Sequence, residues 1–372
     1  MNCLSASKKW SKFIDENFKT IRAPFSAGIE LLPECNFRCI HCYAASNRRN
    51  TIKSMSTEKI YSIIDTLVEH NCVELYFTGG ECLLHKDFER IYIYAKEKGL
   101  LVSVLTNGSL INEKHINLWN KYTPELVSMT LYGSNEESYE RVTGNKSGYT
   151  NLMHAVELLK KNNIYFELKI IGLTENYNDI PEMRKFIRDL GQKNSILAWD
   201  IRPMNDGDSE PISYRVTPKQ AFEVEKNDPE RSYFFKHLAY NENRRKKTNR
   251  QSGGYLYPCA AGYQFVFITH DGYMQSCVKA VEPRYNLIQG NFDEGWKFLG
   301  EEYVQKKASE NFKCLTCDKF RYCGQCTAAF YSEMGDPEKP VPFYCELGEL
   351  RKKYMDDIVK NNENNSSSID NI

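Results

Sequence analysis

Three cysteines, Cys35, Cys39 and Cys42, lie close together within the segment Pro33–Tyr43. Their spacing is Cys-x3-Cys-x2-Cys, and the next cysteine in the chain is Cys72. A closed structural zinc site uses four protein ligands, so this loop alone does not complete one. A cubane iron–sulfur cluster also takes four thiolates, and a cluster held by three leaves one iron able to bind another molecule. The spacing predicts a metal site with an open position, although thiolates alone do not identify the metal.

A second set of cysteines lies in the C-terminal third of the chain. Its seven members are Cys259, Cys277, Cys314, Cys317, Cys323, Cys326 and Cys345. A zinc ribbon would employ the four from Cys314 to Cys326 and leave the other three without a role. Two complete cubane clusters would need eight thiolates, one more than this segment has. The segment is expected to bind metal, with a zinc ribbon and iron–sulfur clusters as the alternatives.

Two glycines and an acid, Gly79, Gly80 and Glu81, follow the second predicted strand. Because glycine has no Cβ, the backbone at these positions can approach a ligand closely. The neighbouring carboxylate can accept hydrogen bonds from an ammonium group. The same residues are also typical of a simple turn, so both interpretations stay open.

These residues are carried by an alternation of short apolar runs and longer amphipathic segments, which is typical of βαβ units and a parallel sheet. The expected strands are Ile29–Leu32, Val73–Phe77, Leu100–Leu105, Leu126–Leu131, Tyr165–Gly172 and Ile196–Ile201. The expected helices are Thr57–His70, Lys86–Lys98, Asn112–Lys121, Tyr149–Asn163 and Asn176–Leu190. Functional residues of such folds gather at the C-terminal ends of the strands, and the cysteine loop follows the first strand directly. Asp200 and Arg202, at the end of the sixth strand, are expected either to line the substrate side or to pair with each other.

The cysteine spacing, with an aromatic residue before the third cysteine, here His41, resembles the radical S-adenosylmethionine (SAM) superfamily. The resemblance implies an α/β fold with a partial (β/α)6 barrel, a [4Fe–4S] cluster held by the three cysteines, and SAM bound to the open iron. It also implies reductive cleavage of SAM to a 5′-deoxyadenosyl radical, which removes hydrogen from a substrate. The residues that it places at SAM are His41, Gly79, Gly80, Glu81, Asn107, Thr130 and Arg141. For Arg141 a surface ion pair is the alternative.

Residues 258–346 resemble the SPASM extension of radical SAM enzymes, which is small, rich in cysteine and carries two auxiliary [4Fe–4S] clusters. The resemblance assigns Cys314, Cys317, Cys323 and Cys345 to the outer cluster, and Cys259, Cys277 and Cys326 to the inner one. The inner cluster is then one thiolate short. Either a substrate thiolate takes this position or another ligand completes it.

Three cysteines, Cys3, Cys72 and Cys82, stand outside both sets. Cys72 precedes an apolar strand, which predicts a buried structural side chain, and Cys3 receives no role. The family usually has proline at the position of Cys82. This cysteine either replaces that proline structurally or, if the reaction is an epimerisation, is the catalytic thiol that returns a hydrogen atom to the substrate radical.

The length of 372 residues is enough for a large domain and a smaller one. The expected divisions are a helical extension at 1–24, the radical SAM partial barrel at 25–204, a linker at 205–255, the SPASM domain at 256–350 and a partly disordered tail at 351–372. A basic run in the linker, residues 244–250, is either a solvated face or a docking strip for an acidic peptide.

The charge balance and the apolar pattern limit the partners of the protein. With 49 basic and 49 acidic residues, no overall field directs it to nucleic acid or to a membrane surface. No apolar run has membrane-spanning length, and the N-terminus does not resemble a signal peptide. We therefore expect a cytoplasmic protein, in which thiols stay reduced and clustered cysteines are metal ligands.

The combination of the two resemblances predicts a maturase that acts on a ribosomally made peptide or protein, by a thioether or carbon–carbon crosslink or by epimerisation. The alternatives are a sulfatase-maturing, formylglycine-generating enzyme and an enzyme of carbohydrates or tetrapyrroles. Sulfatase-maturing relatives have aspartate where Val278 stands, which weighs against the first alternative. A zinc or iron–sulfur protein that only binds or relays electrons is the non-enzymatic alternative. Expected partners are a low-potential electron donor of the flavodoxin or ferredoxin type and a separate leader-binding protein, because the residues before the barrel are too few for a leader-binding domain.

Overall fold

The computed structural model describes residues 20–44, 53–192, 195–240, 253–324 and 326–367. In this part of the chain one sheet of nine strands has the order β6-β5-β4-β3-β2-β1-β7-β8-β9. The strands are β1 (Ser26–Glu30), β2 (Glu74–Thr78), β3 (Leu101–Leu105), β4 (Leu126–Leu131), β5 (Phe166–Ile171), β6 (Leu197–Ala198), β7 (Phe265–Ile268), β8 (Tyr273–Gln275) and β9 (Arg284–Asn286). Strands β1 to β7 run parallel, whereas β8 and β9 are antiparallel to their neighbours. The predicted partial barrel, followed by a cysteine-rich region, is confirmed.

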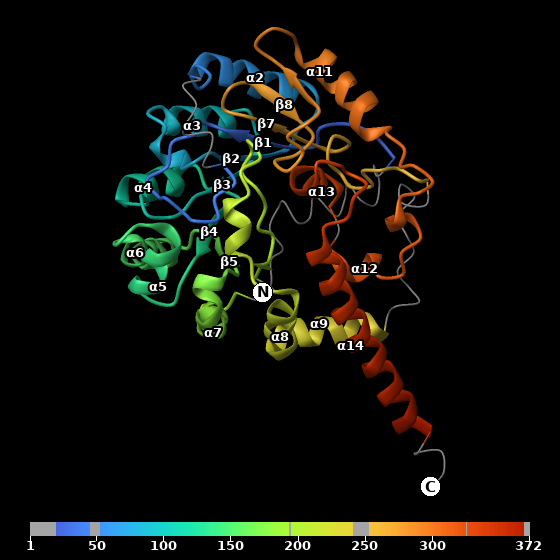
Figure 1. Ribbon diagram of the computed structural model, residues 1–372. Coiled ribbons are helices and arrows are strands. Elements are labelled where there is room, and N and C mark those ends of the chain that lie inside the picture. The colour runs from blue at the N-terminus through green and yellow to red at the C-terminus, as the bar shows by residue number, and fades with distance from the viewer. Residues whose placement is uncertain (1–19, 45–52, 193–194, 241–252, 325, 368–372) are drawn as a thin grey trace.

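Helices cover the outer side of the curved sheet (Figure 1). Those of the first half are α2 (Thr57–Glu69), α3 (Phe88–Glu97), α4 (Glu113–Lys121), α5 (Glu136–Thr143), α6 (Gly148–Lys161) and α7 (Ile180–Asp189). Later helices are α8 (Pro218–Asn227), α9 (Pro229–Tyr240), α11 (Phe292–Leu299), α12 (Phe320–Cys323), α13 (Thr327–Met334) and α14 (Pro342–Ser367). Each early helix buries one apolar face; in α2, for example, Ile60, Ile64 and Leu67 are fully buried in the core.

Three elements differ from the sequence prediction. The helix expected at Asn176–Leu190 begins only at Ile180, because Pro181 suits a first helical turn and a 3-10 segment, Thr174–Asp179, precedes it. Helix α5 was not predicted; the side chain of Asn135 caps its start and the left-handed Gly144 ends it. Strand β6 is shorter than expected, because the chain after Ala198 leaves the sheet.

The sheet joins regions that the predicted domain boundaries separate. Strand β7, within the expected SPASM segment, pairs in parallel with β1. Helix α14 crosses the boundary expected at residue 350, and the end of the tail, 368–372, lies outside the described residues. Most of the expected N-terminal extension and the basic run at 244–250 also lie outside them. The domain boundaries therefore stay predictions.

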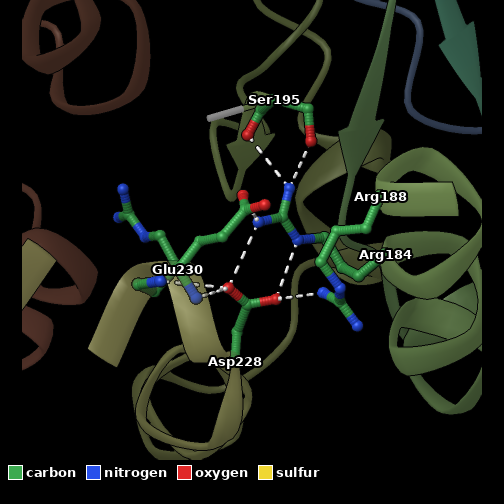
Figure 2. Close-up of polar contacts among 6 residues, drawn as sticks. Arg184, Arg188, Ser195, Asp228 and Glu230 are labelled. Atoms are coloured by element: carbon green, nitrogen blue, oxygen red, sulfur yellow. Dashed lines mark hydrogen bonds and ion pairs between the residues drawn. The ribbon is translucent and has the colours of Figure 1, made fainter. Parts of the chain in front are cut away.

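A buried ion network fixes the segment after β6 to the barrel (Figure 2). Arg184 of α7 is only 2% exposed, and its guanidinium contacts Asp228 at 2.8 and 3.1 Å. It also contacts Glu230 at 2.6 Å and the backbone carbonyl of Ser195 at 3.1 Å. Arg188 approaches Asp228 from the other side at 3.3 Å. The network joins α7 to the start of α9.

Replacing Arg184 by Ala should destabilise the protein by about 3 kcal/mol, because removing one partner leaves a buried carboxylate without its counter-charge. The apparent melting temperature of the purified protein measures this effect. Lys185→Ala is the matched control: Lys185 lies on the same helix, is 71% exposed, and pairs with Asp189 at the surface. Its loss should cost no more than about 0.5 kcal/mol. Equal effects of the two substitutions would contradict a stabilising role of the buried network.

Candidate active site

A cavity of about 470 Å³ opens at the C-terminal ends of the parallel strands. Its lining includes the three cysteines of the first loop and residues in or just after the C-terminal halves of β2 to β6. Among the residues predicted from the sequence, Cys35, Cys39, His41, Cys42, Gly79, Gly80, Asn107, Thr130, Asp200 and Arg202 line it. The fold therefore brings most of the candidate site to one place, as expected for a parallel α/β sheet.

The cysteine loop is held by backbone hydrogen bonds on its outer side. Arg38 N–H donates to the carbonyl of Thr143 at 2.8 Å, and Ile40 N–H donates to the carbonyl of Val142 at 3.0 Å. A turn closes where Cys42 N–H donates to the carbonyl of Cys39 at 3.2 Å. These bonds attach the loop to α5, so that all three cysteines line the cavity.

The two glycines hold β2 against this loop. Gly80 N–H donates to the carbonyl of Leu32, and Glu81 N–H donates to the carbonyl of Glu34, each at 2.8 Å. A Cβ on Gly80 would lie 2.2 Å from the carbonyl oxygen of Glu34. Glycine is therefore required here for the close approach of two backbone segments, in addition to lining the cavity.

Glu81 is turned into the protein rather than toward the cavity. The residue is 1% exposed, and its carboxylate accepts hydrogen bonds from Thr106 Oγ1 and Asn107 N–H, both at 2.7 Å. Burial raises the pKa of this carboxyl, while these hydrogen bonds act in the opposite direction. Through these contacts the Glu81 side chain fixes the loop after β3, and its contact with SAM stays a prediction.

Cys82 does not reach the cavity either. The residue is fully buried, and its thiol donates to the carbonyl of Leu105 at 3.3 Å. Burial raises the pKa of this thiol well above its usual range. Its position favours the structural alternative over the expected catalytic thiol, because the surrounding core separates it from a substrate in the cavity.

Cys82→Ala should therefore retain both SAM cleavage and product formation within about twofold, with a loss of stability of about 1 kcal/mol for the small cavity. Quantifying 5′-deoxyadenosine and modified product in one reaction tests this expectation. Normal SAM cleavage without product would restore the role of Cys82 as hydrogen donor.

Two further residues predicted to contact SAM lie in different places in the structure. Asn107 lines the cavity, and its Nδ2 donates to Asn36 Oδ1 of the cysteine loop at 2.8 Å. Arg141 lies instead at the surface of α5, where it pairs with Glu137 at 3.0 Å with 44% of its side chain exposed. The position of Arg141 agrees with the surface ion pair that was the alternative to a SAM contact.

His41 is buried beside the cysteines with a ring nitrogen unsatisfied. The residue is 9% exposed, and Nδ1 has no hydrogen-bond partner among the described residues. Its ring centre lies 5.2 Å from that of Tyr132. Burial lowers the pKa of His41 to about 4, so the imidazole is neutral at physiological pH. His41 lines the cavity, where its neutral ring is suited to stack on a heterocyclic ligand.

Sequence reasoning missed two lysines of the lining, Lys169 and Lys279. Lys169 lies in the apolar strand β5, an unusual place for a charge, and Lys279 follows Cys277 by two residues. Lys279 forms an ion pair with Asp200, whose carboxylate also accepts from the Tyr344 hydroxyl at 2.9 Å. Burial opposes ionisation of Asp200, but Lys279, Tyr344 and Arg202 together outweigh it and lower the pKa of the carboxyl.

Asp200 and Arg202 both line the cavity, as one alternative predicted. They do not form an ion pair with each other. The guanidinium of Arg202 lies 3.9 Å above the ring of Tyr43 and donates to the carbonyl of Val278 at 2.9 Å. Through Arg202 and Lys279, the end of the barrel contacts the cysteine-rich region.

Residues 29–187 match the family described as the Radical SAM superfamily. The chain carries a radical SAM domain. It is therefore an enzyme of the radical SAM superfamily, and the alternative of a protein that only binds or relays electrons is set aside.

Relatives of this radical SAM enzyme have different functions. An AdoMet-dependent heme synthase of Nitratidesulfovibrio vulgaris is 24% identical over 343 residues, which cover 85% of this chain and 91% of that protein. The antilisterial bacteriocin subtilosin biosynthesis protein AlbA of Bacillus subtilis is 28% identical over 177 residues, covering 47% of this chain and 39% of AlbA. The structure of Streptococcus suis SuiB bound to precursor peptide SuiA superposes with a TM-score of 0.66 at 15% identity, covering 89% of this chain and 78% of SuiB. The similarity to the SuiB structure shows that the two chains share a fold.

The seven C-terminal cysteines of the radical SAM enzyme fall into two groups. Burial raises the pKa of Cys314 to about 12, and the nearby thiols of Cys323, Cys345 and Cys317 act in the same direction. Burial raises the pKa of Cys277 to about 11, and the nearby thiols of Cys326 and Cys259 also raise it. The cysteines that lie near Cys314 and those that lie near Cys277 are the same as the outer and inner sets assigned from the sequence. Within the described residues, no three His, Cys, Asp or Glu side chains converge on a point that would hold a single metal ion.

The described helices include none that is both long and apolar enough to span a membrane.

Proposed function

We propose that this radical SAM enzyme modifies a ribosomally made peptide or protein by abstracting hydrogen from it. The observation that carries the proposal is the composition of the cavity: the cysteine loop forms one part of its wall, and Val278 and Lys279 of the cysteine-rich region form another. A residue inserted there would meet both the SAM site and the segment beside Cys277. The names of AlbA and of the SuiB complex with SuiA support a peptide as the substrate.

The residues of the cavity fit the cofactors that the family implies. Cys35, Cys39 and Cys42 would hold a [4Fe–4S] cluster, which together with SAM supplies a 5′-deoxyadenosyl radical after reduction. Gly79 and Gly80 offer backbone groups without side chains, and Asn107 and Thr130 offer polar ones. His41 adds a neutral aromatic ring to the same lining. These groups would orient SAM, while the surrounding buried side chains exclude water from the reacting atoms.

Asp200 is the carboxylate best placed to accept a proton from the substrate. It lines the cavity, and the ion pair with Lys279 keeps it deprotonated at neutral pH. The residue that directly follows Cys277 is Val278, which has no acid group. Asp200 thus supplies from the barrel side the carboxylate that this position lacks.

We assign residues 256–350 to a SPASM domain with two auxiliary clusters. Cys314, Cys317, Cys323 and Cys345 would bind the outer cluster, and Cys259, Cys277 and Cys326 the inner one, with one position left for a further ligand. The inner set lies next to the cavity, because Val278 and Lys279 of the lining directly follow Cys277. It is therefore placed to accept an electron from a substrate in the cavity.

A tetrapyrrole is the second candidate substrate, because the alignment with the heme synthase spans most of this chain. One experiment separates the candidates. The anaerobically reconstituted and reduced enzyme is given SAM with either a precursor peptide encoded beside its gene or an iron tetrapyrrole, and both substrates are followed by mass spectrometry. A mass change of the peptide is expected. A change of the tetrapyrrole alone would replace the proposal by the second candidate.

A further inference from the structure

A second cavity, of about 510 Å³, adjoins the SAM cavity and shares Tyr43 and Val278 with it. We call it the β7–β8 cavity, because Phe267, the residues Thr269–Asp271 that follow β7, and Tyr273 and Gln275 of β8 line it. Glu30, the last residue of β1, forms part of its wall. The cavity therefore begins where the cysteine loop leaves the sheet and extends toward the cysteine-rich region.

Gln275 lines the β7–β8 cavity with a carboxamide that no described residue hydrogen-bonds. The residue is 5% exposed, lines the cavity, and its side chain makes no hydrogen bond within the described part of the chain. A ligand with one donor and one acceptor would match this side chain, because a carboxamide donates and accepts side by side. A peptide group has this pair of functions.

Four charged groups of the β7–β8 cavity form two pairs. Glu30 Oε2 lies 2.7 Å from His270 Nδ1, and both side chains are buried. Arg284 pairs with Glu282 at 3.1 Å and lies over the ring of Tyr273.

Asp271 belongs to neither of these pairs. Its carboxylate accepts from Thr269 Oγ1 at 2.5 Å, and no basic side chain of the described residues lies within 4 Å of it. Four carboxylates line the cavity in all, those of Glu30, Asp206, Asp271 and Glu282, against two basic groups, the guanidinium of Arg284 and the imidazole of His270. This excess favours a cationic ligand and disfavours one that carries several carboxylates.

We propose that the β7–β8 cavity binds the peptide segment next to the modified residue. Gln275 hydrogen-bonds one peptide group of that segment, and Asp271 pairs with a lysine or arginine side chain within it. This inference rests on the proposed peptide-modifying function and names its substrate more narrowly: a peptide with a basic residue near the site of modification. Tetrapyrroles carry carboxylate side chains, which the carboxylates of the cavity would repel.

Binding of a precursor peptide to the reconstituted holoenzyme with SAM and without reductant tests the proposal, because no chemistry intervenes. A fluorescently labelled precursor peptide and a copy with its basic residues replaced by glutamine are titrated against each protein. Gln275→Leu should weaken binding of the natural peptide about tenfold, the equivalent of about 1.4 kcal/mol for the lost pair of hydrogen bonds. Asp271→Asn should weaken binding of the natural peptide by a similar factor and leave the glutamine copy unaffected. Asp271→Lys should reverse the preference between the natural peptide and a glutamate copy.

Gln289→Leu is the matched control, since Gln289 is exposed on the turn after β9 and does not line the cavity. Iron content and melting temperature establish that each variant is folded. If the wild-type enzyme modifies the peptide but none of the cavity variants alters its affinity or charge preference, this inference is wrong while the proposed function stands. If the wild-type enzyme neither binds nor modifies any such peptide, both are wrong.

Discussion

Replacement of Cys35, Cys39 and Cys42 together by Ala is expected to abolish SAM cleavage and to lower the iron content by about four of about twelve atoms per chain, assuming three cubane clusters. The three side chains line one cavity on a loop attached to α5. They are the protein ligands proposed for the SAM-binding cluster, so their removal leaves that cluster without an anchor. Iron analysis and assay of 5′-deoxyadenosine after anaerobic reconstitution measure both effects.

Cys72→Ala provides the control for this triple variant. Cys72 is 5% exposed, and its thiol donates to the carbonyl of Glu74. Its replacement should cost some stability but no iron. An unchanged iron content in the triple variant would show that the loop holds no cluster, and would also remove the basis of the proposed function.

Gly80→Ala should reduce SAM cleavage by at least a hundredfold, although it adds a single methyl group. The new Cβ would lie 2.2 Å from the carbonyl oxygen of Glu34 and 2.5 Å from that of Pro33. Neither atom can move without displacing the backbone that precedes Cys35. A shift of about 1 Å in a catalytic site can cost a hundredfold in rate. Cleavage of SAM by the reconstituted variant, normalised to its iron content, measures this loss.

Gly99→Ala is the appropriate comparison, because no atom lies within 4 Å of the added Cβ. Its φ of +87° is unfavourable for alanine, so this variant should lose about 1 kcal/mol or more of stability. Its SAM cleavage should nevertheless stay normal. Normal cleavage by Gly80→Ala as well would mean that the loop tolerates displacement and that its position does not limit the reaction.

The part of the candidate site that lies on local motifs could be predicted from the sequence. The cysteine loop and the two glycines each follow a strand, and parallel strands bring such positions to one edge whatever the details of packing. The same reasoning placed Asn107, Thr130 and Asp200 correctly at the cavity. The elements around them are amphipathic, so their existence was clear even where their ends shifted by a few residues.

The direction in which a side chain points could not be predicted in the same way. Glu81 and Cys82 are neighbours of Gly80 in the sequence, yet both turn into the core, because the chain enters a 3-10 turn, Cys82–Leu84, immediately after the glycines. Lys279 was missed for a different reason. Its contact with Asp200 joins segments far apart in the chain, and no periodicity in either segment signals the other.

The pairing of β1 with β7 bears on how the protein is made. Ser26 pairs with Glu74 on one side and with Phe265 on the other. One edge of β1 therefore stays unpaired until nearly 240 further residues have been synthesised. Contacts so distant in sequence form late, and an unpaired strand edge promotes association with other chains in the meantime. A fragment ending near residue 204 would keep that edge exposed permanently. We therefore expect stable insertion of iron into the loop that leaves β1 only after translation of the whole chain, when β7 has paired with β1.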